Sequence, residues 1–142
     1  MRRLFFVSVL SLTVLVIALT GGLMNRAGAV EGVQERPVNI RVTCDGGDVD
    51  EVNIRPWTAA VSRAGSGQVR WQLAGNGVST ATIRPKSTST WPFATTPPLT
   101  VTQGQGTASG AITGGNGPYF YDIIVNCGNG DTVIDPRMDI RP

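Results

Sequence analysis

Histidine is absent from this chain, and Lys86 is its only lysine. Without histidine the chain has no Ser-His-Asp triad, no Cys-His nucleophile and no histidine-ligated metal site. The pattern Asn-x-Ser/Thr is also missing, so there is no acceptor for an N-linked glycan. We therefore expect a protein that is not an enzyme and that carries no cofactor.

Basic charge is scarce outside the N-terminus. Three of the 12 basic residues and none of the 10 acidic residues precede Val30, so the remainder carries nine basic and ten acidic side chains. The formal charge of +2 for the whole chain becomes −1 after Ala29. Nucleic acids and anionic membranes attract clustered lysine and arginine. We expect no nucleic-acid partner, and contact with a membrane only through the N-terminal segment.

The N-terminus has the layout of an export signal. The cationic end Met1-Arg2-Arg3 is followed by the apolar run Leu4–Leu19 and by Ala27-Gly28-Ala29, small residues suited to cleavage. The sequence predicts a signal helix within residues 1–29 and export to the periplasm or the medium. The alternative is an uncleaved anchor facing outward, because the uncharged stretch is long enough to span a bilayer. Gly21-Gly22 interrupts that stretch and favours cleavage.

Cysteine occurs only twice, at Cys44 and Cys127, and both lie after the signal. In an oxidising compartment such a pair is most simply one disulfide. Closing so long a loop would remove unfolded-state entropy worth roughly 4–5 kcal/mol in the chain-entropy model. A redox-active or metal-binding pair is the alternative, but the chain has no Cys-x-x-Cys spacing and no histidine to support it.

Apolar residues after Val30 recur with a period of two, and helix signals are nearly missing. Glycine (18) and proline (9) are frequent and separate the alternating stretches. The sequence predicts seven or eight short strands: Val38–Val42, Val52–Ile54, Val69–Leu73, Thr80–Ile83, Leu99–Thr102, Thr107–Thr113, Tyr119–Asn126 and Asp139–Arg141. We expect an all-β fold, a two-sheet, antiparallel-rich β-sandwich over residues 38–142 that follows a linker at residues 30–37.

One hairpin pattern occurs twice. Asn39-Ile-Arg-Val-Thr-Cys44 is followed by Asn53-Ile-Arg-Pro56, and Asp122-Ile-Ile-Val-Asn-Cys127 is followed by Asp139-Ile-Arg-Pro142. Each copy reads as a strand ending in cysteine, a glycine-containing turn and a returning strand. Cysteines at matching places would meet if the strands are neighbours, which supports the disulfide. Duplication and convergence explain the pattern equally well.

A resemblance to known domains lies in two C-terminal segments, Tyr119-Phe-Tyr-Asp-Ile-Ile-Val125 and Asp135-Pro-Arg-Met-Asp-Ile140. They resemble a Tyr-x-Tyr-(Asp)-x-x-Val … Asp-Pro-x-Ile-x-Val pattern found in small, mostly uncharacterised bacterial domains. The resemblance implies a cupredoxin-like or immunoglobulin-like sandwich without an established activity. It covers about Val38 to Pro142. Cupredoxins bind copper through two histidines, so their copper function does not carry over to this chain.

Acidic residues gather around the first cysteine turn. Hard oxygen ligands on a turn that glycine permits are what Ca²⁺ requires, although the spacing is not that of an EF-hand. The calcium candidates are Asp45, Asp48 and Asp50 beside Glu51, with Asp131 from the second turn. The alternative is an ordinary solvated hairpin turn.

Aromatic residues could offer a stacking surface for a sugar or an apolar partner. Trp57 and Trp91 each adjoin a proline in loop-like contexts, and with Phe93 they form our predicted binding surface. Tyr119 and Tyr121 are further candidates, and packing within loops is the alternative. Trp71 alternates with polar residues and is expected in the core.

Three carboxylates, Asp122, Asp135 and Asp139, could act as paired acids in glycoside hydrolysis, but no spacing rule brings two of them together. The sequence thus favours a non-enzymatic exported module, an envelope or secreted accessory protein whose partner is a protein or a glycan at the cell envelope. The alternatives are a membrane-tethered structural subunit and a lectin-like module that binds Ca²⁺ or carbohydrate.

Overall fold

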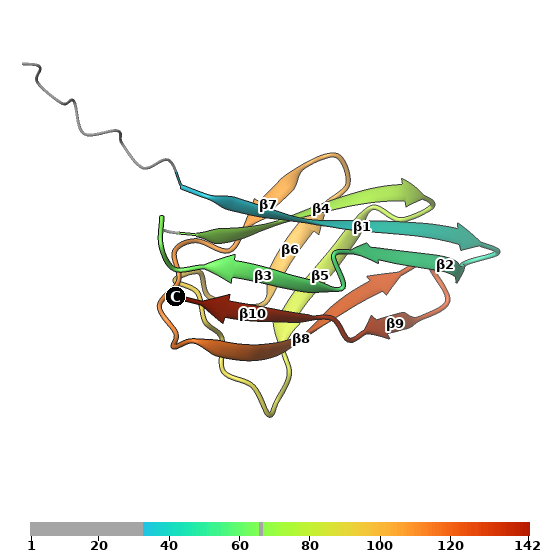
Figure 1. Ribbon diagram of the computed structural model, residues 1–142. Helices are drawn as coiled ribbons and strands as arrows, with labels where there is room; N and C mark the ends of the chain where they lie inside the picture. Colours follow the sequence, from blue (N-terminus) through green and yellow to red (C-terminus); the bar gives the residue numbers. More distant parts are fainter. Residues whose placement is uncertain (1–32, 66) are drawn as a thin grey trace, which may run out of the picture.

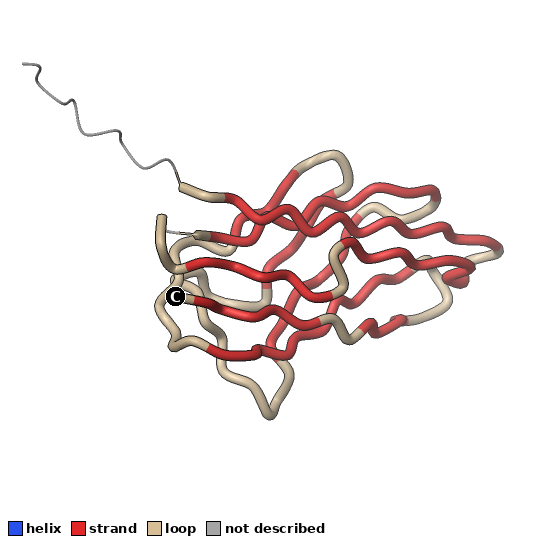
Figure 2. The backbone as a smooth tube through the Cα atoms, in the orientation of Figure 1, coloured by secondary structure: helices blue, strands red, loops and turns tan. Residues whose placement is uncertain are grey.

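The computed structural model describes residues 33–65 and 67–142, and this part of the chain contains ten strands and no helix (Figures 1 and 2). The predicted signal helix and most of the predicted linker lie outside the described residues. The strands are β1 (Glu35–Asp45), β2 (Asp48–Arg55), β3 (Thr58–Ser62), β4 (Gln68–Asn76), β5 (Thr80–Pro85), β6 (Leu99–Thr102), β7 (Gly106–Ala108), β8 (Gly117–Asn126), β9 (Asp131–Ile134) and β10 (Arg137–Arg141). The predicted all-β fold is confirmed.

Two sheets form the layers of the fold. One has four strands in the order β2-β1-β4-β7, and the other has six in the order β3-β10-β8-β5-β6 with β9 beside β8. Strands β1 and β4 run parallel, as do β3 and β10, while the remaining paired strands are antiparallel. The predicted antiparallel-rich arrangement of two sheets is therefore confirmed.

The core lies between the sheets and follows from the two-residue period. In β1 the buried positions are Val38, Ile40 and Val42, with polar residues between them. Trp71 of β4 is fully buried, as predicted, and Tyr121 of β8 faces the same core. Alternate side chains of a strand point to opposite faces, so each strand gives one row to the core and the other to its outer face.

The strands differ from the prediction at several places. Strand β1 begins at Glu35, inside the segment predicted as linker, because residues from Glu35 onward pair with β4. Strands β3 and β9 were not predicted from the sequence, since both are short and β3 is rich in alanine, a weak strand former. The predicted strand Thr107–Thr113 ends at Ala108. There Ser109 turns inward, and its hydroxyl accepts a hydrogen bond from the amide of Val69 (2.9 Å).

The two similar hairpins lie in different sheets. In the first, β2 returns along β1 as one strand. In the second, the return is divided: β9 pairs with the end of β8, and β10 pairs with its beginning. The break falls at Asp135 and Pro136, just before β10, where proline lacks the amide that a strand would use. Pro136 thus immediately precedes the first residue of β10.

Candidate functional site

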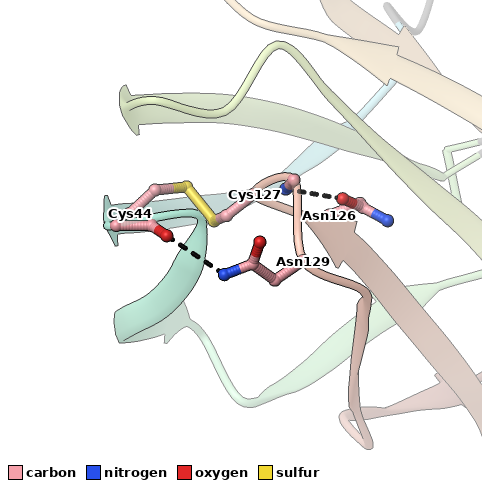
Figure 3. The surroundings of a disulfide bond; sticks show 6 residues. Cys44, Asn126, Cys127 and Asn129 are labelled. Carbon is pink, nitrogen blue, oxygen red and sulfur yellow. Dashed lines mark hydrogen bonds between the residues drawn. A yellow bond between two sulfur atoms is a disulfide. The ribbon is translucent and has the colours of Figure 1, made fainter.

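A disulfide joins the two sheets at the end where both cysteine hairpins turn (Figure 3). Cys44 of β1 and Cys127 after β8 are bonded, with their Cα atoms 5.6 Å apart, which confirms the predicted pair. The turns also contact each other directly. The backbone amide of Asn129 donates to the carbonyl of Gly47 (2.8 Å), and its side-chain amide donates to the carbonyl of Gly46 (3.0 Å). The cysteines therefore link hairpins from opposite sheets, not neighbouring strands of one sheet.

The calcium candidates lie at this same end, and all of them are exposed. Asp45 and Asp48 lie opposite each other in the strand register at the first turn, and Asp50 lies farther along β2. The side chain of Asp131 accepts a hydrogen bond from the side-chain amide of Asn126 (2.9 Å). Within residues 33–65 and 67–142, no group of three or more histidine, cysteine or acidic side chains is arranged to hold a metal ion. The geometry thus lends the calcium hypothesis no support.

The predicted aromatic surface does not form. Phe93 is only 4% exposed, and Trp91 stacks on the buried Trp71 with ring centroids 5.9 Å apart. Phe93 and Tyr121 pack edge-on against the same indole of Trp71. Only Trp57, at 52% exposure, lies on the surface, and it takes part in none of these ring pairs. Trp91 and Phe93 are therefore packing residues, because the loop after β5 folds them onto the core.

Burial also changes the acid–base behaviour of Tyr121. Its hydroxyl lies in the aromatic cluster, where desolvation disfavours the phenolate. Burial raises the pKa of Tyr121 to about 12, against a smaller opposing effect of Trp71. The hydroxyl therefore stays protonated at neutral pH and serves in packing.

A charged cluster lies on the outer face of the six-stranded sheet. Lys86 Nζ is 2.6 Å from Asp135 Oδ1 and 3.2 Å from Asp122 Oδ1, and Arg84 Nε is 3.2 Å from Asp122 Oδ2. Burial acts to raise the pKa of Asp122, but its hydrogen bonds with Lys86 and Arg84 outweigh this and hold it below its usual value. The hydrogen bonds to Asp135 and Asp122 raise the pKa of Lys86.

The cluster brings together two of the three candidate catalytic acids, Asp122 and Asp135, on either side of Lys86. A glycosidase pair needs one carboxyl that is protonated near neutral pH, which requires a raised pKa. The pKa of Asp122 moves the other way. Asp122 and Asp135 are paired with the two cations Arg84 and Lys86, so the charges of the cluster are compensated within the protein.

The outer face of the four-stranded sheet carries a different surface, which we call the polar face. Its side chains alternate with the buried residues of β1, β2 and β4. The register places Asn39 between Arg55 and Gln72, and Arg41 between Asn53 and Ala74. The polar face comprises Asn39, Arg41, Thr43, Glu51, Asn53, Arg55 and Gln72.

Two shallow hollows lie on the polar face. One, of about 400 Å³, extends from Asn39 and Arg41 over β4 to the turn Gly104–Gly106. The other, of about 560 Å³, extends from the same two residues over β2 to Arg55. Ala74 and Gly106 bring little or no side chain to the first hollow, which leaves it open. Asn39 and Arg41 thus border both hollows and make them parts of one surface.

The two arginines of the polar face form no ion pair with any residue that the structure describes. Within the described residues, neither Arg41 nor Arg55 has a carboxylate within ion-pair distance. Arg55 Nε instead donates to Asn53 Oδ1 (3.1 Å). This surface was not predicted from the sequence, because the alternation was interpreted only for the buried residues and the surface consists of the polar half of the same strands. The signal was present in Asn39-x-Arg41-x-Thr43 and Glu51-x-Asn53-x-Arg55.

Comparison with known proteins assigns no family, since no family model matches the chain and no curated protein matches it. The surfaces themselves must therefore distinguish the possible functions. The cations of the ion cluster are paired with carboxylates of the same cluster, and the aromatic cluster is largely buried. The polar face combines hollows with unpaired charge, so it is the candidate binding site.

Proposed function

We propose that this protein is a non-enzymatic exported module, an envelope or secreted accessory protein that binds a partner through the polar face. The observation that carries the proposal is the pair of hollows that share Asn39 and Arg41, with no carboxylate of the described residues in ion-pair range of Arg41 or Arg55. Hydrogen-bonding groups and charges that find no partner inside a protein are available to a ligand. A glycan or a protein of the cell envelope would supply that partner.

Export is supported by two independent features. The disulfide between Cys44 and Cys127 is typical of proteins from oxidising, extracytoplasmic compartments. Residues 1–29 have the layout of a cleaved signal. Among the residues that the structure describes, no helix is long and apolar enough to cross a membrane. The C-terminal pattern Tyr119–Ile140 supports a sandwich of the cupredoxin-like or immunoglobulin-like type.

Export is tested by the intact mass of the protein recovered from its own host, before and after reduction. A species that begins at Val30 and gains about 2 Da on reduction, the mass of two hydrogens, is the expected result. A full-length species in the membrane fraction would replace this proposal with the membrane-tethered alternative. A mass unchanged by reduction would contradict the oxidising compartment.

Binding is tested by sedimentation of the native protein with washed envelopes of its host. We expect the double variant Arg41→Ala/Arg55→Ala to lose most of the sedimented fraction, because both side chains border the larger hollow of the polar face. The matched control is Arg137→Ala/Arg141→Ala, which removes the same charge from β10 in the other sheet. Equal sedimentation of the two double variants would contradict binding through the polar face.

A further inference from the structure

The unpaired cations of the described chain are not evenly distributed. In the six-stranded sheet, Arg84 pairs with Asp122, and Arg137 and Arg141 flank Asp139 at 4.0 and 3.9 Å. In the four-stranded sheet, Arg41 and Arg55 border one hollow with no carboxylate in ion-pair range among the described residues. Glu51 is the one acidic side chain lining that hollow. The hollow thus offers an anion two guanidinium groups.

Planar amide groups surround these arginines. Asn39 and Asn53 line the same hollow as Arg41 and Arg55, and Gln72 and Gln105 line the neighbouring one. An amide presents both a donor and an acceptor, which suits the paired hydroxyl groups of a sugar. A guanidinium forms two parallel hydrogen bonds to a carboxylate. The combination fits a ligand that is rich in hydroxyl groups and carries carboxylates.

The hollows also set the shape of the ligand. They lie on either side of Asn39 and Arg41 and extend over β2 in one direction and over β4 to the β7 side in the other. Strands in a sheet are about 4.8 Å apart, so the three spacings from β2 to β7 cover about 14 Å. An extended chain lying across the strands would occupy both hollows, whereas a single small anion would occupy one.

We propose that the polar face binds an acidic polysaccharide, with a uronate-type carboxylate held between Arg41 and Arg55 and sugar hydroxyls on the neighbouring amides. The inference rests on the proposed binding function and names the ligand class for the same surface. A protein partner fits less well, because stable protein interfaces centre on aromatic and large apolar anchors. The apolar lining of these hollows is limited to the small Ala74 and to Ile40 and Leu73 of the buried rows. Two arginines are also fewer than a nucleic-acid footprint requires.

The test compares two polymers that differ only in the carboxylate. Binding of the native protein to polygalacturonate and to carboxyl-reduced polygalacturonate is measured by affinity electrophoresis at low salt. We expect retardation by the acidic polymer alone, and weaker retardation as salt rises, because exposed charges are screened. Arg41→Ala should weaken binding about tenfold or more, and Arg41→Lys should recover only part of it, since lysine lacks the planar fork. Arg36→Ala is the matched control, an exposed arginine of β1 that lines neither hollow.

Three results would overturn the ligand class. These are equal retardation by both polymers, no retardation by either, and complete competition by duplex DNA at equal charge, which would indicate recognition of charge alone. An unchanged circular dichroism spectrum and an intact disulfide in the Arg41 variants exclude a folding defect. The envelope experiment separates the two levels of failure. If Arg41→Ala/Arg55→Ala abolishes sedimentation with envelopes but polygalacturonate is not bound, the ligand class is wrong and the binding function stands.

Discussion

Replacing Cys44 and Cys127 together with alanine removes the covalent link between the sheets. The bond joins positions 83 residues apart, and the chain-entropy model then gives about 4.5 kcal/mol of lost stability at 25 °C. Small domains are typically stable by about 5–15 kcal/mol, so the variant should be marginally folded. Folding should survive at low temperature, because Asn129 still connects the two turns through its hydrogen bonds to Gly46 and Gly47.

Urea unfolding of the exported protein measures this loss. Two samples separate the crosslink from the packing of the sulfur atoms: the double alanine variant, and the unaltered protein held reduced. Reduction leaves both cysteine side chains in place as thiols and removes only the bond between their sulfur atoms. The reduced protein should therefore show most of the stability loss of the double alanine variant. The dependence of the unfolding free energy on urea should also steepen, because an unlinked unfolded chain exposes more surface. A loss below about 1 kcal/mol in both samples would refute the loop-entropy reasoning.

Three further perturbations test the packing and the charges. Gly75→Ala would place a Cβ against the carbonyl oxygen of Val42 and should cost about 3 kcal/mol or more in urea unfolding. Gly104→Ala, also at positive φ but with open space, should cost about 1 kcal/mol, and equal costs would contradict the close approach of β1 and β4. The raised pKa of Tyr121, about 12, means that the folded state keeps a proton that the unfolded state loses above pH 10, so stability should fall by up to ~1.4 kcal/mol per pH unit between pH 10 and 12. Tyr121→Phe should lack this fall, and parallel alkaline profiles of the two proteins would show that the hydroxyl is solvated. Lys86→Met should raise the pKa of Asp122, which lies below its usual value in the folded protein and so contributes stability above its unfolded pKa. Acid unfolding of this variant should then begin at higher pH than that of the Arg137→Met control, and coincident acid profiles would contradict the ion cluster.

The alternation of polar and apolar residues made the fold class predictable. In β1, Val38, Ile40 and Val42 are buried as the two-residue period requires, and β8 shows the same pattern at Tyr121 and Ile123. Strand β3 escaped prediction because Ala59 and Val61, although buried, are too few and too small to give a strong signal. Burial against the opposite sheet is what makes this segment a strand.

The candidate sites were less predictable, because a site depends on which strands are neighbours. Phe93 looked like a surface residue, since proline and polar residues surround it, but its loop returns to the core and buries it against Trp71. Arg41 and Arg55 belong to the two arms of one predicted hairpin, and the register of β1 with β2 sets them beside one hollow. The alternation predicts both side chains on the polar rows, but the hollow also depends on the pairing register, which the sequence pattern does not specify.

The sequence alone determined the all-β class, the positions of most strands and the cysteine pair, because these depend on local periodicity and on the presence of only two thiols. The tertiary structure decided how the strands are ordered, that the disulfide links opposite sheets, and which polar side chains share a face. A residue's place in the two-residue period determines whether its side chain points inward or outward. Its neighbours across the strands are fixed only by the register in which the strands pair, and that register leaves Arg41 and Arg55 beside one hollow.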